Sequence, residues 1–171
     1  VPTTTTEAPT TTTIPFPTLT AWQLIQADPA LSSIAAAIEA RPELVRLLSG
    51  TEPLTLFMPT NTALLAMPTW PAISIDDVLF DDFLRGHVVA GALTSVDVLA
   101  SFELTSIGDD TLVIDRLAGT INGATFVTID AQATNGYLHT VNAPLITPAP
   151  TIETATTEST TPVTAAALRN G

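Results

Sequence analysis

Histidine is the side chain best suited to proton transfer near neutral pH, and the chain has two, His87 and His139. No Gly-x-Ser-x-Gly turn is present to supply a serine nucleophile, and there is no cysteine. The two histidines also lack the His-x-x-x-His spacing of a zinc site. The sequence therefore predicts a non-catalytic protein without cofactor or metal, in which both histidines hydrogen-bond neighbouring loops. A hydrolase using His139 or His87 is the remote alternative.

Carboxylates are the second group that could do chemistry. Asp76, Asp77, Asp81 and Asp82 crowd one predicted helix, and 109–110 is an Asp-Asp turn. Calcium needs six to eight oxygens supplied by a loop that wraps the ion, and no Asp-x-Asp-x-Asp-Gly pattern occurs. These residues are predicted to be solvated surface and turn formers, with a weak surface calcium site as the alternative.

The overall charge excludes several partners. The net charge is −12 and the pI about 4.1, with five arginines and no lysine. Nothing in such a chain neutralises phosphates, so neither nucleic acid nor an anionic membrane is an expected partner. No apolar run is long enough for a membrane-spanning segment, and no Asn-x-Ser/Thr glycosylation signal exists. The chain starts with Val1, which fits a secreted protein after signal-peptide removal, or a shortened chain.

Threonine and proline dominate both ends. Residues 1–18 hold nine Thr and four Pro, and 148–164 repeat the theme. We therefore predict an N-terminal tail, 1–18, a folded domain, 19–147, and a C-terminal tail, 148–171. Thr with Pro is typical of O-glycosylated stalks. The candidate O-glycosylation sites are Thr3, Thr4, Thr5, Thr6, Thr10, Thr11, Thr12, Thr13, Thr156, Thr157, Thr160 and Thr161. Alternatively, β-branched Thr favours extended backbone, and such a tail can add as a strand to the sheet of a neighbouring copy.

The first half of the domain reads as helical. Helical spacing covers 31–38, and Pro42 fits the first turn of a helix that Gly50 ends. A buried strand is predicted at 54–59, followed by a helix capped by Thr60 or Asn61. Ser74 is predicted to cap a helix over 75–85. Its predicted core positions are Val78, Leu79 and Phe83, with Phe80 on the flank.

The second half reads as β structure. Asn-Gly pairs at 122–123 and 135–136 are strong hairpin signals, because both residues tolerate positive φ. Helices first and antiparallel strands later predict an α+β fold. The predicted strands are HVVAG, ELTSI, TLVID, GTI, ATFVTID and YLHTV.

Three segments in order resemble the fasciclin-type domain. They are 55–68 (TLFMPTNTALLAMP), 83–91 (FLRGHVVAG) and 121–148, with Asn-Gly-x-x-His near its end. The resemblance implies a fasciclin-like β-wedge of two packed sheets with a helical N-terminal half. The positions that match the family motifs, and are expected to be scaffold, are Thr60, Asn61, His87, Asn135, Gly136 and His139.

The chain departs from the family pattern at its contact sites. Gly86 stands where the family has Tyr before His, and Asn142 where it often has Asp. Animal relatives have an integrin-linked Asp-Ile pair where this chain has Asp130-Ala131. The resemblance therefore implies the fold and an adhesive theme, not an integrin partner. The candidate partner-contact segment is 88–99, although core packing is the competing interpretation. The candidate contact residues are Val88, Val89, Asp97, Leu99 and Asp130.

The resemblance and the tails together imply a secreted, non-catalytic module at the cell surface or in the extracellular matrix. It would act in adhesion or assembly through contacts with a protein partner or with other copies of itself. In one version, glycosylated tails hold an adhesive monomer away from a surface. In the other, the chain is the repeating subunit of an extracellular filament, with a Thr-rich tail docked on the next copy. A small-ligand or glycan-binding module is less favoured, because the chain has only nine aromatic residues.

Overall fold

A computed structural model describes residues 17–146 of the chain. The predicted folded domain therefore lies almost wholly within the described part. The candidate glycosylation sites and nearly all of both predicted tails lie outside the described residues, so the domain boundaries remain a prediction.

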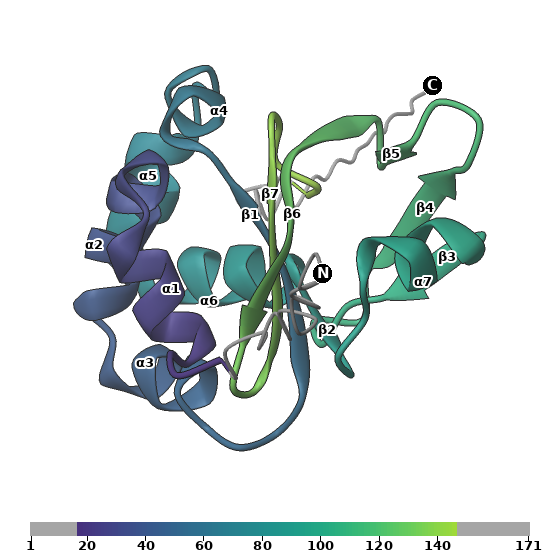
Figure 1. The fold of residues 1–171 in the computed structure, drawn as a ribbon. Coiled ribbons are helices and arrows are strands. Elements are labelled where there is room, and N and C mark those ends of the chain that lie inside the picture. Colours follow the sequence, from purple (N-terminus) through teal and green to yellow (C-terminus); the bar gives the residue numbers. More distant parts are fainter. Residues whose placement is uncertain (1–16, 147–171) are drawn as a thin grey trace, which may run out of the picture.

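The N-terminal half is a layer of short helices, drawn at the left of Figure 1. Several helices are capped by a side chain just before their first turn: Thr20 forms a capping box with Gln23 at the first helix, and Asp28 caps the 3₁₀ turn. The helices of this layer are α1 (Ala21–Ala27), η1 (Pro29–Leu31), α2 (Ser32–Glu39), α3 (Pro42–Leu48), α4 (Asn61–Leu65), α5 (Trp70–Ile75) and α6 (Asp77–Arg85). Helix α7 (Ser95–Ala100) lies apart from them, beside β3 and β4 at the right of Figure 1.

Seven strands form one continuous hydrogen-bonded order, β2-β1-β7-β6-β5-β4-β3. The only parallel neighbours among the described strands are β1 and β7, and the other pairs are antiparallel. The strands are β1 (Leu54–Pro59), β2 (Val88–Ala90), β3 (Glu103–Thr105), β4 (Thr111–Asp115), β5 (Thr120–Ile121), β6 (Ala124–Ala133) and β7 (Gly136–Val141). The α+β prediction is confirmed, and each predicted β segment contains a strand.

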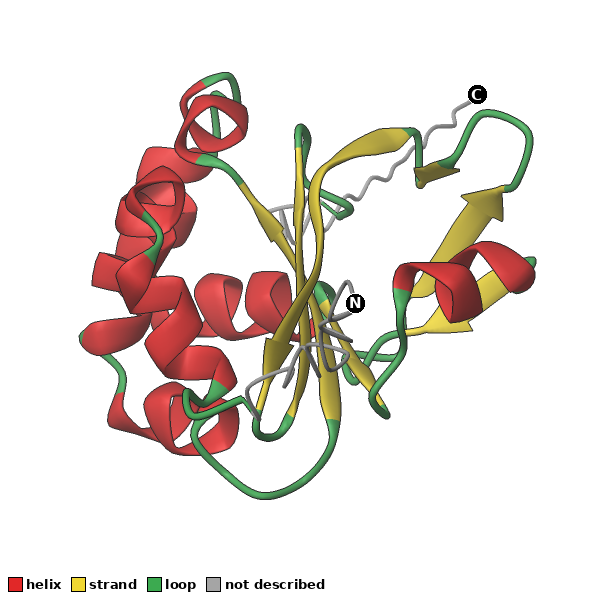
Figure 2. Ribbon diagram, viewed as in Figure 1, coloured by secondary structure: helices red, strands yellow, loops and turns green. Residues whose placement is uncertain are grey.

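The strand order folds over into a wedge. Figure 2 shows β1, β7 and β6 in the centre, with β3 and β4 set apart as a second arm. A single antiparallel bridge, Val89 to Ser106, connects the first strand of the order to the residue that follows the last. The two packed sheets expected from the resemblance are thus the two arms of one strand order.

Two hydrophobic cores fill the two sides of the central strands. The larger core packs the helices against one face and includes Ile25, Ile34 and Leu56. The smaller core lies inside the wedge and includes Phe57 and Val141. All six residues of β1 are buried, because this strand has a core on each face and a strand on each side.

The prediction for 74–85 was wrong in two respects. Ser74 does not cap a helix, because α5 continues through it to Ile75. The cap of α6 is Asp76, whose carboxylate accepts the N–H groups of Val78 and Leu79. Starting the helix at Asp77 turns Phe80 fully into the core and leaves Val78 71% exposed.

Candidate functional site

Thr60 and Asn61 connect the helices to β1. The Thr60 hydroxyl accepts the N–H of Ala63 and caps α4, as predicted for this position. The Asn61 side chain accepts the N–H of Ser33 at 2.9 Å and donates to the carbonyl of Pro29 at 2.9 Å. One amide therefore satisfies backbone groups near the start of α2 and fixes α4 against it.

Asn135 makes the corresponding connection at the β6–β7 turn. Its buried amide accepts the N–H of Ala21, at 2.8 Å, and donates to the carbonyl of Leu48, at 3.0 Å. These are backbone groups at the start of α1 and the end of α3. Gly136 follows at φ 139°, and a Cβ there would collide with the backbone carbonyl of Leu54 in β1.

His87 lies at the junction of α6 and β2 and is fully buried. Its Nδ1 lies 2.7 Å from the carbonyl oxygen of Phe83, and its Nε2 accepts the N–H of Leu145 at 2.8 Å. These partners select the neutral ring with its proton on Nδ1. Burial lowers the pKa of His87 to about 4, and the hydrogen bond to Phe83 opposes that shift only in part.

His139 is buried in the middle of β7, stacked on Phe57 with 5.3 Å between ring centroids. Its Nδ1 accepts the N–H of Asp130 at 3.2 Å, and its Nε2 lies 3.1 Å from the carbonyl oxygen of Leu93. This ring is the opposite neutral tautomer, with its proton on Nε2. Burial lowers the pKa of His139, against the raising effects of the Leu93 carbonyl and the Asp130 charge.

Asp130 connects the His139 region to α7. Its backbone is left-handed, with φ 58°, within an irregular part of β6. The carboxylate accepts the N–H of Ser95, at 2.6 Å, and also the Ser95 hydroxyl proton. Partial burial works against ionisation, but the Ser95 hydrogen bonds outweigh it and lower the pKa of Asp130. Thr94 and Asp97 complete a capping box at the start of α7.

This arrangement positions backbone rather than activating a nucleophile. The Ser95 hydroxyl donates to a carboxylate and not to a histidine. Each imidazole makes one hydrogen bond to a backbone N–H and one to a backbone carbonyl, so neither has a free lone pair facing a hydroxyl.

Burial corrects part of the predicted partner contact. Val88 is buried in the larger core and Val89 in the smaller core, so neither side chain is available to a partner. Leu99 is half-buried against the smaller core. Asp97 and Asp130 are exposed, and the structure brings both of them to the start of α7.

Exposed apolar side chains flank the Ser95–Asp130 contact. Val96 is 74% exposed next to Ser95, and Ile129 is 50% exposed next to Asp130. Val127, two residues earlier on β6, is 58% exposed. We call the set Val96, Asp97, Val127, Ile129 and Asp130 the α7–β6 surface.

Sequence reasoning missed Ser95 and Leu93. Thr94 and Asp97 have the spacing of a capping box, which could have placed the start of α7 and drawn attention to Ser95. Leu93 takes part through its carbonyl group, which no sequence pattern reveals.

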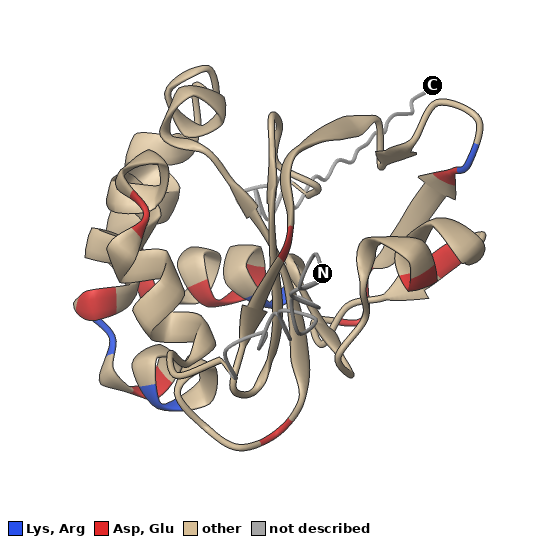
Figure 3. Cartoon of the chain, in the orientation of Figure 1, with Lys and Arg blue, Asp and Glu red and all other residues tan. Residues whose placement is uncertain are grey.

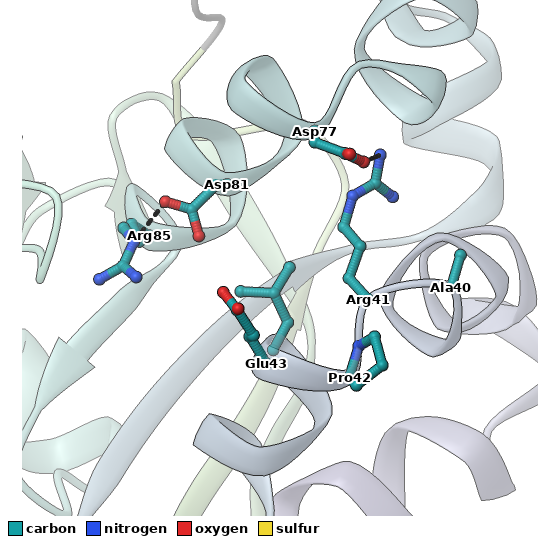
Figure 4. A pocket seen from close by; sticks show the side chains of 8 residues that line it. Ala40, Arg41, Pro42, Glu43, Asp77, Asp81 and Arg85 are labelled. Atoms are coloured by element: carbon teal, nitrogen blue, oxygen red, sulfur yellow. Dashed lines mark hydrogen bonds and ion pairs between the residues drawn. The ribbon is translucent and has the colours of Figure 1, made fainter.

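A pocket of about 380 Å³ lies between the α2–α3 junction and α6. Figure 4 shows Arg41 reaching Asp77 on one side and Arg85 reaching Asp81 on the other. The Arg41 guanidinium also stacks on Phe80, with its central carbon 4.4 Å from the ring centroid. The charged groups of the pocket walls are thus paired: Arg41–Asp77 connects the start of α3 to α6, and Arg85–Asp81 lies within α6.

The remaining acidic residues are spread over the molecule. Figure 3 shows them on both the helical layer and the strand arms, with few basic residues between them. Over residues 17–146, no three His, Asp or Glu side chains come close enough to hold a metal ion. Within the same range, no helix has the length and apolar character needed to cross a membrane.

Comparison with known proteins agrees with this fold. The profile of the Fasciclin domain matches residues 29–147. Protein sll1483 of Synechocystis is 32% identical over 126 residues, covering 68% of this chain and 67% of that protein. Transforming growth factor-beta-induced protein ig-h3 of Sus scrofa is 30% identical over 131 residues, which are 72% of this chain but only 19% of that protein.

A solved structure gives the same architecture. The FAS1 domain pair from the insect cell adhesion molecule fasciclin I matches with a TM-score of 0.64 at 20% identity. The match covers 76% of this chain and 51% of that one. The chain belongs to the fasciclin domain family, whose members are adhesion-type modules that bind other proteins.

Proposed function

We propose that the chain is a secreted, non-catalytic fasciclin module that acts at the cell surface or in the extracellular matrix through the α7–β6 surface. The observation that carries the proposal is the rigid presentation of exposed apolar side chains there. Val96 and Ile129 lie beside a hydrogen-bonded connection that runs from Ser95 through Asp130 to His139. Preorganised apolar groups next to carboxylates fit a protein partner better than a small molecule.

Attachment of the cells that produce the chain to surfaces coated with it tests this proposal. Changing Val96 and Ile129 together to Ser should reduce attachment severalfold, because the central apolar contacts are removed. Val113→Ser is the matched control, since Val113 is a Val of similar exposure, 56%, on β4 and is not one of the residues of this surface. Equal attachment to all three coatings would exclude the α7–β6 surface as the adhesive site.

The second candidate function is the subunit of an extracellular filament, assembled by docking a Thr-rich tail on the next copy. It is favoured by the four-residue Thr runs at 3–6 and 10–13, which suit an added strand. Negative-stain electron microscopy of the secreted protein, beside a version lacking residues 1–18, tests it. Filaments that disappear on truncation support the subunit; dispersed particles in both samples oppose it and favour the adhesive monomer.

A further inference from the structure

Strand β6 has a long side without a strand partner among residues 17–146. It pairs with β7 along 126–133, whereas β5 pairs with it only at Ala124 and Thr125. We call the unpaired side of 126–133 the β6 edge. A strand edge of this kind is a template for another strand unless charge, proline, shortness, β-bulges or a covering segment protects it.

The β6 edge has some of the usual protections, namely two bulges and one charge, and lacks others. The β6 edge contains no proline or lysine, and it carries the exposed side chains of Val127 and Ile129. Its single charged residue, Asp130, turns its carboxylate to Ser95. Bulges break the register at two places in this stretch, so a partner could pair only over a few consecutive residues.

The terminal strand β3 offers a contrast. It has only three residues, one of them the charged Glu103. Just beyond its end, Ser106 is bridged back to Val89 of β2. Shortness and a bridge to another strand therefore protect the β3 edge, and the β6 edge has neither, whereas each edge carries one charged residue.

The chain itself provides a segment of suitable chemistry. Residues 1–16 contain two runs of four Thr, at 3–6 and 10–13, each free of proline. Thr is β-branched and favours the extended backbone, and a four-residue run matches the short regular stretches of the β6 edge. Sixteen extended residues reach roughly 50 Å, enough to contact a neighbouring molecule.

Pairing within the same chain is disfavoured where the tail leaves the domain. The carbonyl of Leu19 accepts the N–H of Thr134, at 2.8 Å, at the end of β6. In an extended chain, alternate residues present their backbone groups to the same side, so Pro17 and Pro15 would face this edge next. Proline has no N–H to donate, so the ladder cannot continue directly from Leu19 along β6.

We infer that the β6 edge accepts a Thr run from the N-terminal segment of a second copy as an added strand. This inference rests on the filament subunit proposed above and names the acceptor on the folded domain. Backbone hydrogen bonds would supply the affinity, and the side chains of Val127 and Ile129 would pack against the Thr methyl groups. Because donor and acceptor lie on one chain, each copy can donate to one neighbour and accept from another, and such a head-to-tail contact propagates where the rotation between copies does not close.

Disulfide trapping tests the acceptor, because the natural chain has no cysteine. Full-length chains carrying Ile129→Cys and full-length chains carrying Thr5→Cys are mixed and mildly oxidised, and the mixed dimer is quantified by mass spectrometry. Val113→Cys replaces Ile129→Cys in the control, since Val113 is 56% exposed on a strand that lies between β3 and β5. We expect at least fivefold more mixed dimer with Ile129→Cys than with Val113→Cys.

Sedimentation of the unmodified chain distinguishes a failure of the β6 edge as the acceptor from a failure of the proposed filament subunit. Self-association with equal trapping at both positions would overturn the β6 edge while leaving the filament subunit intact. A chain that sediments as a monomer and gives no mixed dimer would overturn both. A chain carrying Thr5→Cys and Ile129→Cys together that closes its disulfide internally at high dilution would overturn the second copy as the occupant.

Discussion

His87 and His139 stabilise two regions of the β half with the same kind of hydrogen bonds, but the donor and acceptor nitrogens of the ring are exchanged between them. Both rings are buried and neutral, and each accepts one backbone N–H and faces one backbone carbonyl. The proton is on Nδ1 in His87 and on Nε2 in His139. The difference lies in their surroundings: His87 fixes Leu145, near the end of the domain, whereas His139 fixes the loop and bulge beside the α7–β6 surface.

The comparison teaches why a buried histidine can be valuable without catalysing anything. A neutral imidazole offers one donor and one acceptor on opposite sides of a rigid ring, and so it can join two backbone segments that have no strand pairing between them. The variants below should show that both rings stabilise the fold in the same way but contribute different amounts to the free energy of unfolding.

Replacing His87 with Ala should give the largest loss of stability. The change leaves a cavity beside Phe83 and leaves the N–H of Leu145 without its acceptor. We expect a decrease of about 4 kcal/mol in the free energy of unfolding, the sum of cavity and hydrogen-bond costs. Urea denaturation measures it. A loss smaller than that of His139→Ala would break the ranking of the two rings.

Acidification should reproduce part of this loss through His87. Its pKa is about 4 in the folded chain and about 6.5 in the unfolded chain, so the unfolded chain binds the proton more readily. The neutral His87 ring therefore makes its full contribution to the free energy of unfolding above pH 6.5. This contribution is lost as the pH falls towards 4, by about 3 kcal/mol in total. Urea denaturation at several pH values should show a shallower slope for His87→Gln; an identical slope would assign the acid sensitivity to other groups.

Replacing His139 with Ala should cost less, about 2 kcal/mol. The lost ring stacks on Phe57, but the freed groups belong to Leu93 and Asp130, which lie nearer to solvent. Differential scanning calorimetry should record a lower melting temperature. An unchanged melting temperature would show that His139 does not fix this loop.

Replacing Asp130 with Asn should have the smallest effect on stability, below about 1 kcal/mol, because the carboxylate is exposed and screened by water. The variant keeps the size of the side chain but weakens its hydrogen bonds with Ser95. Hydrogen exchange at the start of α7 should be faster, with little change elsewhere. Equal exchange rates in variant and parent would mean that Ser95 is held by other contacts.

Local features of this fold are predictable from the sequence. The Thr60 cap, the 54–59 strand and the hairpin at 135–136 each depend on residues close together along the chain. The error at 74–85 is also local: Ser74 and Asp76 are both good caps, and only the end of α5 at Ile75 decides between them.

The candidate site was less predictable, because its contacts join distant backbone atoms. The two residues of the His87–Leu145 bond are 58 positions apart, and those of the His139–Leu93 bond are 46 apart. A backbone N–H or carbonyl is present at nearly every residue, so the sequence does not indicate which one a histidine will bind. The burial of Val88 and Val89 likewise depends on core residues from distant parts of the chain.

The parallel pairing of β1 and β7 constrains the order of events during folding. Leu54 pairs with Gly136, so the chain must close a loop of 136 − 54 = 82 residues before the central strands meet. Contacts of such separation make folding slow compared with that of helical bundles. A nascent chain exported from its N-terminus would therefore expose the buried face of β1 until residue 141 had followed. The central sheet of this domain can thus close only after nearly the whole described segment has emerged.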